Sequence, residues 1–204
     1  TNINNSTGQK YSGNYVQYFT NEELYNNLEN AISKGIIETS SIAEDDEYEN
    51  PRENQKMFPK DGIGAFIITT PDGLNYHYAL PVYQFQEITR NKKNGSQAFL
   101  LKIQEEPYAY TWLLTAITGP DYVDNGSPGI DNSDYGYWIQ FDYGKWSDAF
   151  MWKTPYEETE NYRFGIKQIY YLNSISTRTH TAYFIKDVRN DGKGASINEI
   201  LTAR

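Results

Sequence analysis

The first apolar pattern along the chain has the spacing of a helix and lies near the N-terminus. Its stripe comprises Leu24, Leu28, Ala31 and Ile32. Thr20 and Glu23 have the spacing of a capping box, and Phe19 precedes the cap at the position of a hydrophobic staple. Gly35 follows the stripe, where a glycine commonly ends a helix. The pattern predicts an amphipathic helix over residues 20–34 that packs on a sheet.

Farther along the chain, apolar residues alternate with polar ones, as they do in β-strands. Two runs rich in β-branched and aromatic residues, 65–70 and 74–80, flank a Pro-Asp-Gly sequence. This arrangement predicts a β-hairpin with its turn at 71–73. In the second run, His77 shares a face with Asn75 and lies opposite the large apolar residues. We therefore expect His77 on the more polar face, in a surface or interface role rather than a catalytic one.

Six further runs have the composition of strands, and turn sequences such as Asn94-Gly95 separate them. They span 81–88, 97–103, 110–117, 137–143, 167–175 and 179–185. The run at 110–117 also fits a short buried helix, and we favour the strand. Many strands with a single helix indicate a mainly β protein of antiparallel sheets, a sandwich or a sheet layer, with one N-terminal amphipathic helix.

The stretch at 38–60 interrupts these patterns because it is polar, acidic and contains Pro51. We interpret it as a solvated loop, and a cation-binding role for its acidic residues is the alternative. It divides the chain into a helix-containing N-terminal segment with an acidic loop, 1–60, and a β-rich domain, 61–204. The sequence begins at Thr1 without a signal peptide, so we expect one folded unit of a longer protein.

Composition and charge exclude several classes of function. The chain has 18 basic and 27 acidic residues and a net charge of -9, which repels nucleic-acid phosphates and anionic lipids. No apolar run approaches the roughly 20 residues that span a bilayer. The absence of cysteine and the presence of only 2 histidines exclude disulfides, thiol nucleophiles and most zinc sites. We expect neither a nucleic-acid partner nor membrane insertion.

The segment at 119–136 is rich in aspartate, asparagine and glycine. Its candidate metal ligands are Asp121, Asp124, Asp131 and Asp134. Carboxylate oxygens are the ligands that Ca²⁺ prefers, although the spacing here is not that of an EF-hand. Asp, Asn and Gly are also ordinary turn residues. Calcium as a cofactor of this loop is therefore one hypothesis, and a loop that splays into water without a cation is the one we favour.

Aromatic residues are frequent, with 19 Tyr, 9 Phe and 4 Trp. Several crowd the stretch 135–152, and the candidates for a ligand-binding surface are Trp138, Trp146, Trp152 and Tyr135. If the rings project from one edge, they form a sugar-stacking platform of the kind found in carbohydrate-binding modules. If they point inward, they form core, which is the interpretation we favour.

No catalytic residue can be assigned from motifs. The chain has no Gly-x-Ser-x-Gly sequence, no glycine-rich phosphate loop and no His-Glu-x-x-His sequence. The carboxylates that could pair as the acid and base of a glycosidase are Glu105, Glu106, Glu157, Glu158 and Glu160. Their order in the sequence does not place any two of them across a cleft. We favour a non-enzymatic role and keep a glycan-directed hydrolase as the alternative.

Three parts of the chain resemble a known group of proteins. They are 61–83, which contains Asp72-Gly73-Leu74-Asn75-Tyr76-His77-Tyr78, 112–124, which begins Trp112-Leu113-Leu114, and 171–184 together with 189–192. They resemble segments of very large secreted surface proteins of Bacteroidota bacteria. More distantly, they are similar to RHS/YD-repeat proteins and to the B components of Tc toxins, where such strands recur in a β-rich shell. The resemblance implies a β-rich piece of an exported protein, with an RHS-like sheet layer, and it transfers no catalytic residue.

From the sequence we therefore expect a non-enzymatic structural or binding segment of a large secreted cell-surface protein. Its partners would be other segments of the same protein or surface assembly. The alternative is a carbohydrate-binding module or glycan-directed hydrolase that uses the Trp/Tyr-rich region, with glycans as its ligands.

Overall fold

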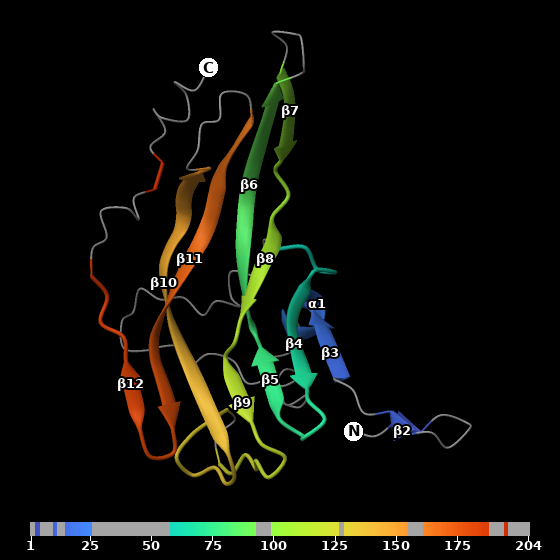
Figure 1. The fold of residues 1–204 in the computed structure, drawn as a ribbon, viewed down its shortest axis with the longest axis vertical. Coiled ribbons are helices and arrows are strands. Elements are labelled where there is room, and N and C mark those ends of the chain that lie inside the picture. The colour runs from blue at the N-terminus through green and yellow to red at the C-terminus, as the bar shows by residue number, and fades with distance from the viewer. Residues whose placement is uncertain are drawn as a thin grey trace. The chain divides into compact units, whose positions relative to one another are not determined.

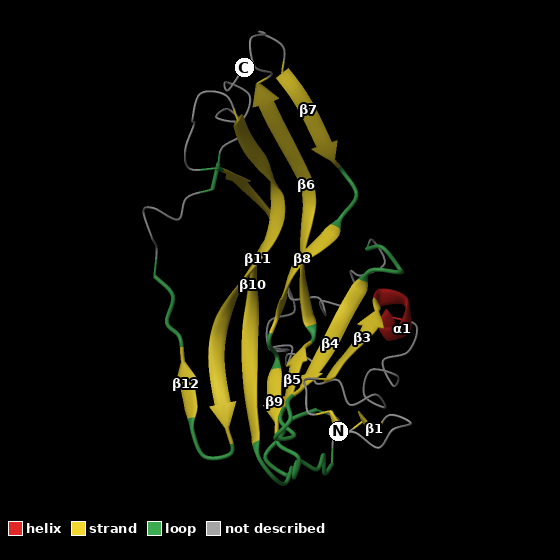
Figure 2. Cartoon of the chain, turned by 45° about the vertical axis from the view of Figure 1, so that its right-hand side comes forward, coloured by secondary structure: helices red, strands yellow, loops and turns green. Residues whose placement is uncertain are grey.

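The computed structural model of the chain describes residues 3–4, 10–11, 15–25, 58–92, 99–126, 129–154, 161–187 and 194–195. The chain is mainly β, as the sequence predicts. Figure 2 shows the strands in yellow and one short helix in red. Within the described ranges, no helix is both long and apolar enough to cross a membrane.

Ten strands form one antiparallel sheet (Figure 1). In the order of hydrogen-bonded neighbours they are β3 (Tyr15–Thr20), β4 (Ile63–Thr69), β5 (Asn75–Tyr78), β9 (Ala116–Thr118), β10 (Trp138–Lys153), β11 (Asn161–Thr177), β6 (Leu80–Lys92) and β7 (Phe99–Gln104). Off this path, β12 (Thr181–Tyr183) pairs with β11, and β8 (Tyr108–Leu113) pairs with β6. A separate pair consists of β1 (Ile3–Asn4) and β2 (Lys10–Tyr11).

The strands follow the predicted runs but differ from them in length. The run at 110–117 becomes β8 and β9, which are separated at Leu114 and Thr115, so the strand interpretation is confirmed over the buried helix. β10 and β11 contain 16 and 17 residues and extend beyond the predicted runs. Strands of this length exceed the usual five or six residues.

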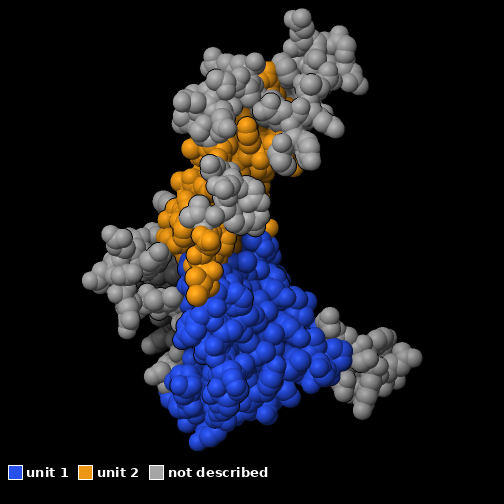
Figure 3. All heavy atoms as spheres, turned by 60° about the vertical axis from the view of Figure 1, so that its left-hand side comes forward, with its two compact units in different colours: residues 1–81, 111–144, 172–184 blue, residues 82–110, 145–171, 185–204 orange. Residues whose placement is uncertain are grey.

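The chain forms two compact units, which Figure 3 colours blue and orange. Unit 1 comprises residues 1–81, 111–144 and 172–184, and unit 2 comprises 82–110, 145–171 and 185–204. Limits of the units fall within strands β6, β8, β10 and β11. Most of the acidic stretch that separates the two predicted segments lies outside the described residues, so the division at residue 60 stays a prediction.

Unit 1 contains the helix α1 (Asn21–Tyr25), which starts at the predicted capping box. The Thr20 N–H donates to Glu23 Oε2 at 2.8 Å, and the Glu23 N–H donates to Thr20 Oγ1 at 3.3 Å. The predicted staple residues Phe19 and Leu24 are both buried. They belong to a hydrophobic cluster with Ala65, Ile67 and Ala79 from the hairpin. The remainder of the helix predicted over residues 20–34 lies outside the described residues.

The predicted hairpin is β4 and β5, and its register is defined by the pairs Phe66 with Tyr78 and Thr69 with Asn75. In the turn, the Gly73 N–H donates to the carbonyl oxygen of Thr70 at 2.9 Å. Gly73 has a φ of +89°, a conformation that a side chain disfavours. The Pro-Asp-Gly turn therefore fixes this register locally.

His77 is buried, with only 4% of its surface exposed, so the prediction of a surface position is wrong. His77 lies on the buried face of the sheet, because the residues paired with it on the two neighbouring strands, Ile67 and Ala116, are also buried. Its Nε2 shares a 3.1 Å hydrogen bond with Thr118 Oγ1, and its buried Nδ1 has no partner among the described residues. Burial lowers the pKa of His77 to about 4, because the charged imidazolium is poorly solvated there.

The burial of His77 predicts a loss of stability in acid. The unfolded imidazole takes up a proton near pH 6.5 and the folded one near pH 4, so this contribution is complete above pH 6.5 and is lost as the pH falls toward 4. When the pH is lowered from about 7.5 to about 5, the His77 contribution should reduce the free energy of unfolding by about 2 kcal/mol. His77→Gln should remove that part of the pH dependence in urea unfolding. The matched control is His180→Gln, at the exposed second histidine, and an equal effect of both variants would contradict the prediction.

Candidate functional site

Residues 119–126 and 129–136, the described part of the acidic segment, form a closed loop in unit 1. At its base, the Gly119 N–H donates to the carbonyl oxygen of Tyr137 at 2.8 Å. Farther in, Val123 and Tyr135 form an isolated antiparallel bridge. Gly136 has a φ of +83°, and a Cβ at this position would collide with the backbone of Asp121. The loop therefore depends on a glycine at its closing turn.

Asp134 is the centre of this loop and is fully buried. Its Oδ1 accepts a hydrogen bond from the Asn125 N–H at 2.9 Å. Its Oδ2 accepts from the Asp131 N–H and from the Tyr122 hydroxyl, each at 2.9 Å. Burial, together with the hydrogen bond to Asp134, raises the pKa of Tyr122, so the phenol stays protonated and donates. The interpretation of the loop as splayed into water is therefore wrong for Asp134.

The other three predicted ligands also accept hydrogen bonds from backbone N–H groups. Asp121 Oδ1 accepts from Tyr137 at 3.2 Å, and Asp124 Oδ2 accepts from Gly129 at 3.3 Å. Asp131 Oδ1 accepts from the Ser133 N–H at 2.6 Å, and the hydrogen bonds of Ser133 lower the pKa of Asp131. In this part of the chain the carboxylates hold the backbone of the loop in place.

No group of three or more His, Cys, Asp or Glu side chains in the described ranges is arranged to hold a metal ion. Calcium at Asp121, Asp124, Asp131 and Asp134 stays a prediction. Its binding would have to displace or share oxygens that already accept hydrogen bonds from the loop.

The four predicted ligand-binding aromatic residues are divided between the two units. Tyr135 and Trp138 belong to unit 1, whereas Trp146 and Trp152 belong to unit 2. Trp138 is 5% exposed, as the core interpretation expects, and Trp152 is half-buried. Tyr135 and Trp146 are exposed, at 58% and 63% of their surfaces. Ligand binding by these four residues stays a prediction.

Each exposed ring has a neighbour on one side. The Arg178 guanidinium lies 5.9 Å from the centre of the Tyr135 ring and donates a hydrogen bond to the carbonyl oxygen of Asp134. In unit 2, Trp146 packs edge-to-face against Tyr171 with ring centres 5.7 Å apart. Trp146 is therefore the more accessible of the two for stacking on a sugar.

Of the five carboxylates considered for a glycosidase pair, Glu105 and Glu106 lie in the exposed turn between β7 and β8. Glu157, Glu158 and Glu160 lie outside the described residues. No pairing of these acids can be derived from the described part of the chain.

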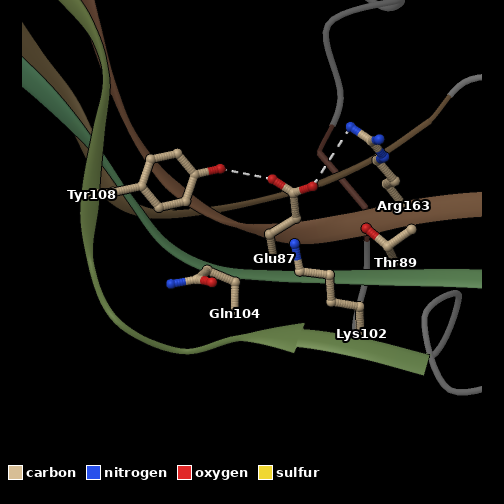
Figure 4. A pocket seen from close by; sticks show the side chains of 6 residues that line it. All are labelled: Glu87, Thr89, Lys102, Gln104, Tyr108 and Arg163. Carbon is tan, nitrogen blue, oxygen red and sulfur yellow. Dashed lines mark hydrogen bonds and ion pairs between the residues drawn. The ribbon is translucent and has the colours of Figure 1, made fainter.

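A polar pocket that the sequence did not indicate lies in unit 2 (Figure 4). Its volume is about 660 Å³, and it is lined by Glu87, Thr89, Lys102, Gln104, Tyr108 and Arg163. All six side chains are polar, and they come from strands β6, β7, β8 and β11. A cavity of this size is within the range of about 300–1,000 Å³ that is typical of small-molecule sites.

The register of three strands brings most of the pocket residues together. Thr89 on β6 pairs with Lys102 on β7 and with Arg163 on β11, which makes a row across the sheet. Two residues along β6, Glu87 pairs with Gln104 on one side and with a glycine on the other. Directly paired residues, and residues two apart on one strand, share a face of the sheet. The pocket is therefore a direct product of antiparallel register.

Glu87 links two other side chains of the pocket (Figure 4). The Tyr108 hydroxyl donates to Glu87 Oε2 at 2.7 Å, and Arg163 Nη1 lies 3.7 Å from Glu87 Oε1. Burial and the Glu87 carboxylate raise the pKa of Tyr108 to about 12. Lys102 makes no ion pair with any residue in the described ranges. Its described lining residues thus include two cationic side chains and one carboxylate.

The sequence contains part of the signal for this pocket, although no prediction from the sequence included it. Glu87 and Thr89, and likewise Lys102 and Gln104, are polar residues two positions apart with an isoleucine between them. That alternation marks a polar face on each strand. The pairing of the two faces depends on register between distant segments, which the sequence pattern does not supply.

Comparison with known proteins gives no relative for this fold or these sites. No family model matches the chain, and neither the curated proteins nor the solved structures contain a significant match to it.

From its hydrogen bonds we predict that Asp134 stabilises the loop more than the other aspartates of the loop do. Asp134→Ala leaves three donors without their acceptor and should lower the free energy of unfolding by about 3 kcal/mol or more. Asp124→Ala removes one long hydrogen bond at an exposed position and should change it by about 0.5 kcal/mol at most. Urea unfolding of the two variants measures both effects.

Asp134→Ala, together with Asp131→Ala, also tests the role of calcium. Because the carboxylates are engaged by the backbone, we expect equal melting temperatures in EDTA and in millimolar CaCl₂. A calcium-dependent rise in melting temperature that Asp134→Ala or Asp131→Ala abolishes would instead establish the calcium hypothesis.

For the stability prediction, a similar free energy of unfolding in Asp134→Ala and Asp124→Ala would contradict the structural role of Asp134.

Proposed function

We propose that the chain is a non-enzymatic structural or binding segment of a large secreted cell-surface protein. In this proposal its partners are other segments of the same protein or surface assembly. The resemblance to secreted surface proteins of Bacteroidota and to RHS/YD-repeat proteins supports an exported, β-rich segment. The net charge of -9 argues against nucleic acid as a partner.

The proposal depends above all on the balance between exposed and buried apolar side chains. Among the described residues, 15 large hydrophobic residues are exposed, whereas 12 hydrophobic residues are buried. Single exposed apolar residues are ordinary, whereas contiguous exposed apolar surface marks places where proteins meet partners. Contiguous ones, such as those of β3, therefore support a segment whose surface is completed by neighbouring parts of an assembly.

Strand β3 gives a specific example of such a surface. It lies at one end of the strand order and, among the described strands, pairs only with β4. Its residues Tyr15, Val16 and Tyr18 are exposed. An exposed edge strand with apolar side chains is a template for the addition of another strand. This edge supports docking of an extended segment from the same large protein.

The glycan-binding alternative is favoured by one observation. Trp146 is the most exposed tryptophan among the described residues, and Tyr171 holds it edge-to-face. An exposed ring held by a second ring is suited to stacking on a pyranose. In this alternative, Trp146 would supply the carbohydrate contact, and the Asp-rich loop would have no part in it.

The size and location of the natural protein test the main proposal. An antibody raised against these 204 residues should detect, in the cells that make the protein, a species much larger than 23.6 kDa. That species should be released or should be digested when intact cells are treated with protease. A control antibody against a cytoplasmic protein should give an unchanged band. A species of about the mass of this chain, or one protected inside the cells, would refute the proposal.

A further inference from the structure

The polar pocket of unit 2 combines groups that suit two kinds of ligand chemistry at once. Lys102 on β7 and Arg163 on β11 are cations in one row across the sheet, on either side of Thr89 on β6. The Arg163 guanidinium makes one long contact, of 3.7 Å, with Glu87. It therefore keeps N–H donors for a planar, anionic group such as a carboxylate.

The remaining lining groups are suited to hydroxyls. Glu87 accepts one hydrogen bond from Tyr108 and retains lone pairs for further donors. Thr89 supplies a hydroxyl, and Gln104 supplies an amide on the same face of the sheet as Glu87. The Tyr108 ring adds an aromatic wall beside these polar groups, as Figure 4 shows. Such a mixture is typical of sites that bind polyols.

The charges decide which polyol fits best. A simple anion would be attracted by Lys102 and Arg163 but repelled by Glu87, with no hydroxyl to donate to that carboxylate. A neutral sugar would satisfy Glu87 but would leave Lys102 without a counter-charge and Arg163 with only its long contact to Glu87. A ligand that carries both a carboxylate and adjacent hydroxyls satisfies both sets of groups.

We propose that this pocket binds an acidic saccharide, with the carboxylate of a uronic acid held by Lys102 and Arg163 and its ring hydroxyls donating to Glu87. This proposal names the class of ligand for the binding function proposed above, and it rests on that function. It concerns residues other than the Trp/Tyr-rich region, because no residue of 135–152 lines the pocket. All six of the named lining residues belong to unit 2.

A matched pair of ligands tests the proposal. Methyl β-D-glucuronide and methyl β-D-glucoside differ only at the carboxylate, and sodium acetate supplies a carboxylate alone. With the complete chain, isothermal titration calorimetry or ligand-observed NMR should show saturable, millimolar binding of the glucuronide. The glucoside and acetate should each bind about tenfold more weakly or worse, and added NaCl should weaken the glucuronide complex.

Substitutions locate the site. Lys102→Gln and Arg163→Gln should each weaken glucuronide binding about tenfold and leave glucoside binding unchanged. Tyr108→Phe keeps the ring but releases Glu87, and it should weaken binding by a smaller factor. Lys60→Gln makes the same change of charge at an exposed residue of unit 1 and should have no effect. Lys102 has no ion pair to lose among the described residues, so Lys102→Gln should fold normally even where Arg163→Gln does not.

Several outcomes would overturn the proposal. These are the absence of saturable glucuronide binding, equal affinity for the glucoside or acetate, and unchanged affinity in both Lys102→Gln and Arg163→Gln. Loss of binding in Trp146→Ala, with the pocket variants unaffected, would assign glycan binding to the exposed aromatic pair instead. These results are independent of the size and location of the natural protein, so failure of the saccharide proposal can be distinguished from failure of the proposed function.

Discussion

Antiparallel register is the constraint on which the rest of this structure depends. Side chains alternate between the two faces of a strand, so a shift of one residue would exchange every inward residue for an outward one. The register of β5 with β4 and β9 places His77 on the same face as buried Ile67 and Ala116, and the register of β6 with β7 and β11 brings the pocket residues together. Neither arrangement survives a slip of one position. Local devices such as the Gly73 turn and the bulge between Ile166 and Lys167 therefore matter beyond their own segments.

The register places several polar residues at inward positions, so hydrogen bonds as well as apolar contacts stabilise the interior. In unit 2, buried Gln168 accepts from the Tyr83 N–H at 3.1 Å and donates to Asp148 at 3.2 Å. Lys145 in turn lies 3.0 Å from Asp148. Lys167 is placed between the rings of Tyr110 and Trp152, at 5.3 and 5.7 Å. Gln168 is the buried member of this network, and hydrogen bonds to both sides of a buried amide favour one packing of the strands around it.

Features that depend on neighbours in the sequence could be predicted, and features that depend on distant segments could not. The capping box of Thr20 and Glu23 and the turn at Gly73 involve residues a few positions apart, and both were found. The side of the sheet that buries His77 depends on what packs there, and the polarity of Asn75 pointed to the wrong side. The pocket needs Lys102, Glu87 and Arg163 on three strands, and the sequence contains no local signal for their pairing.

The two charged clusters of the molecule contrast in how far their charges are satisfied. In the loop around Asp134, each carboxylate accepts hydrogen bonds from groups of the same loop, so its negative charge is used to order the backbone. In the pocket, Glu87 is only partly satisfied, and Lys102 has no ionic partner within the described ranges. A ligand gains most where polar groups are held in place but retain hydrogen-bonding capacity. By this criterion, the carboxylates of the loop are suited to ordering its backbone, and the pocket, with two cations in an otherwise acidic chain, is better suited than the loop to accept an anion.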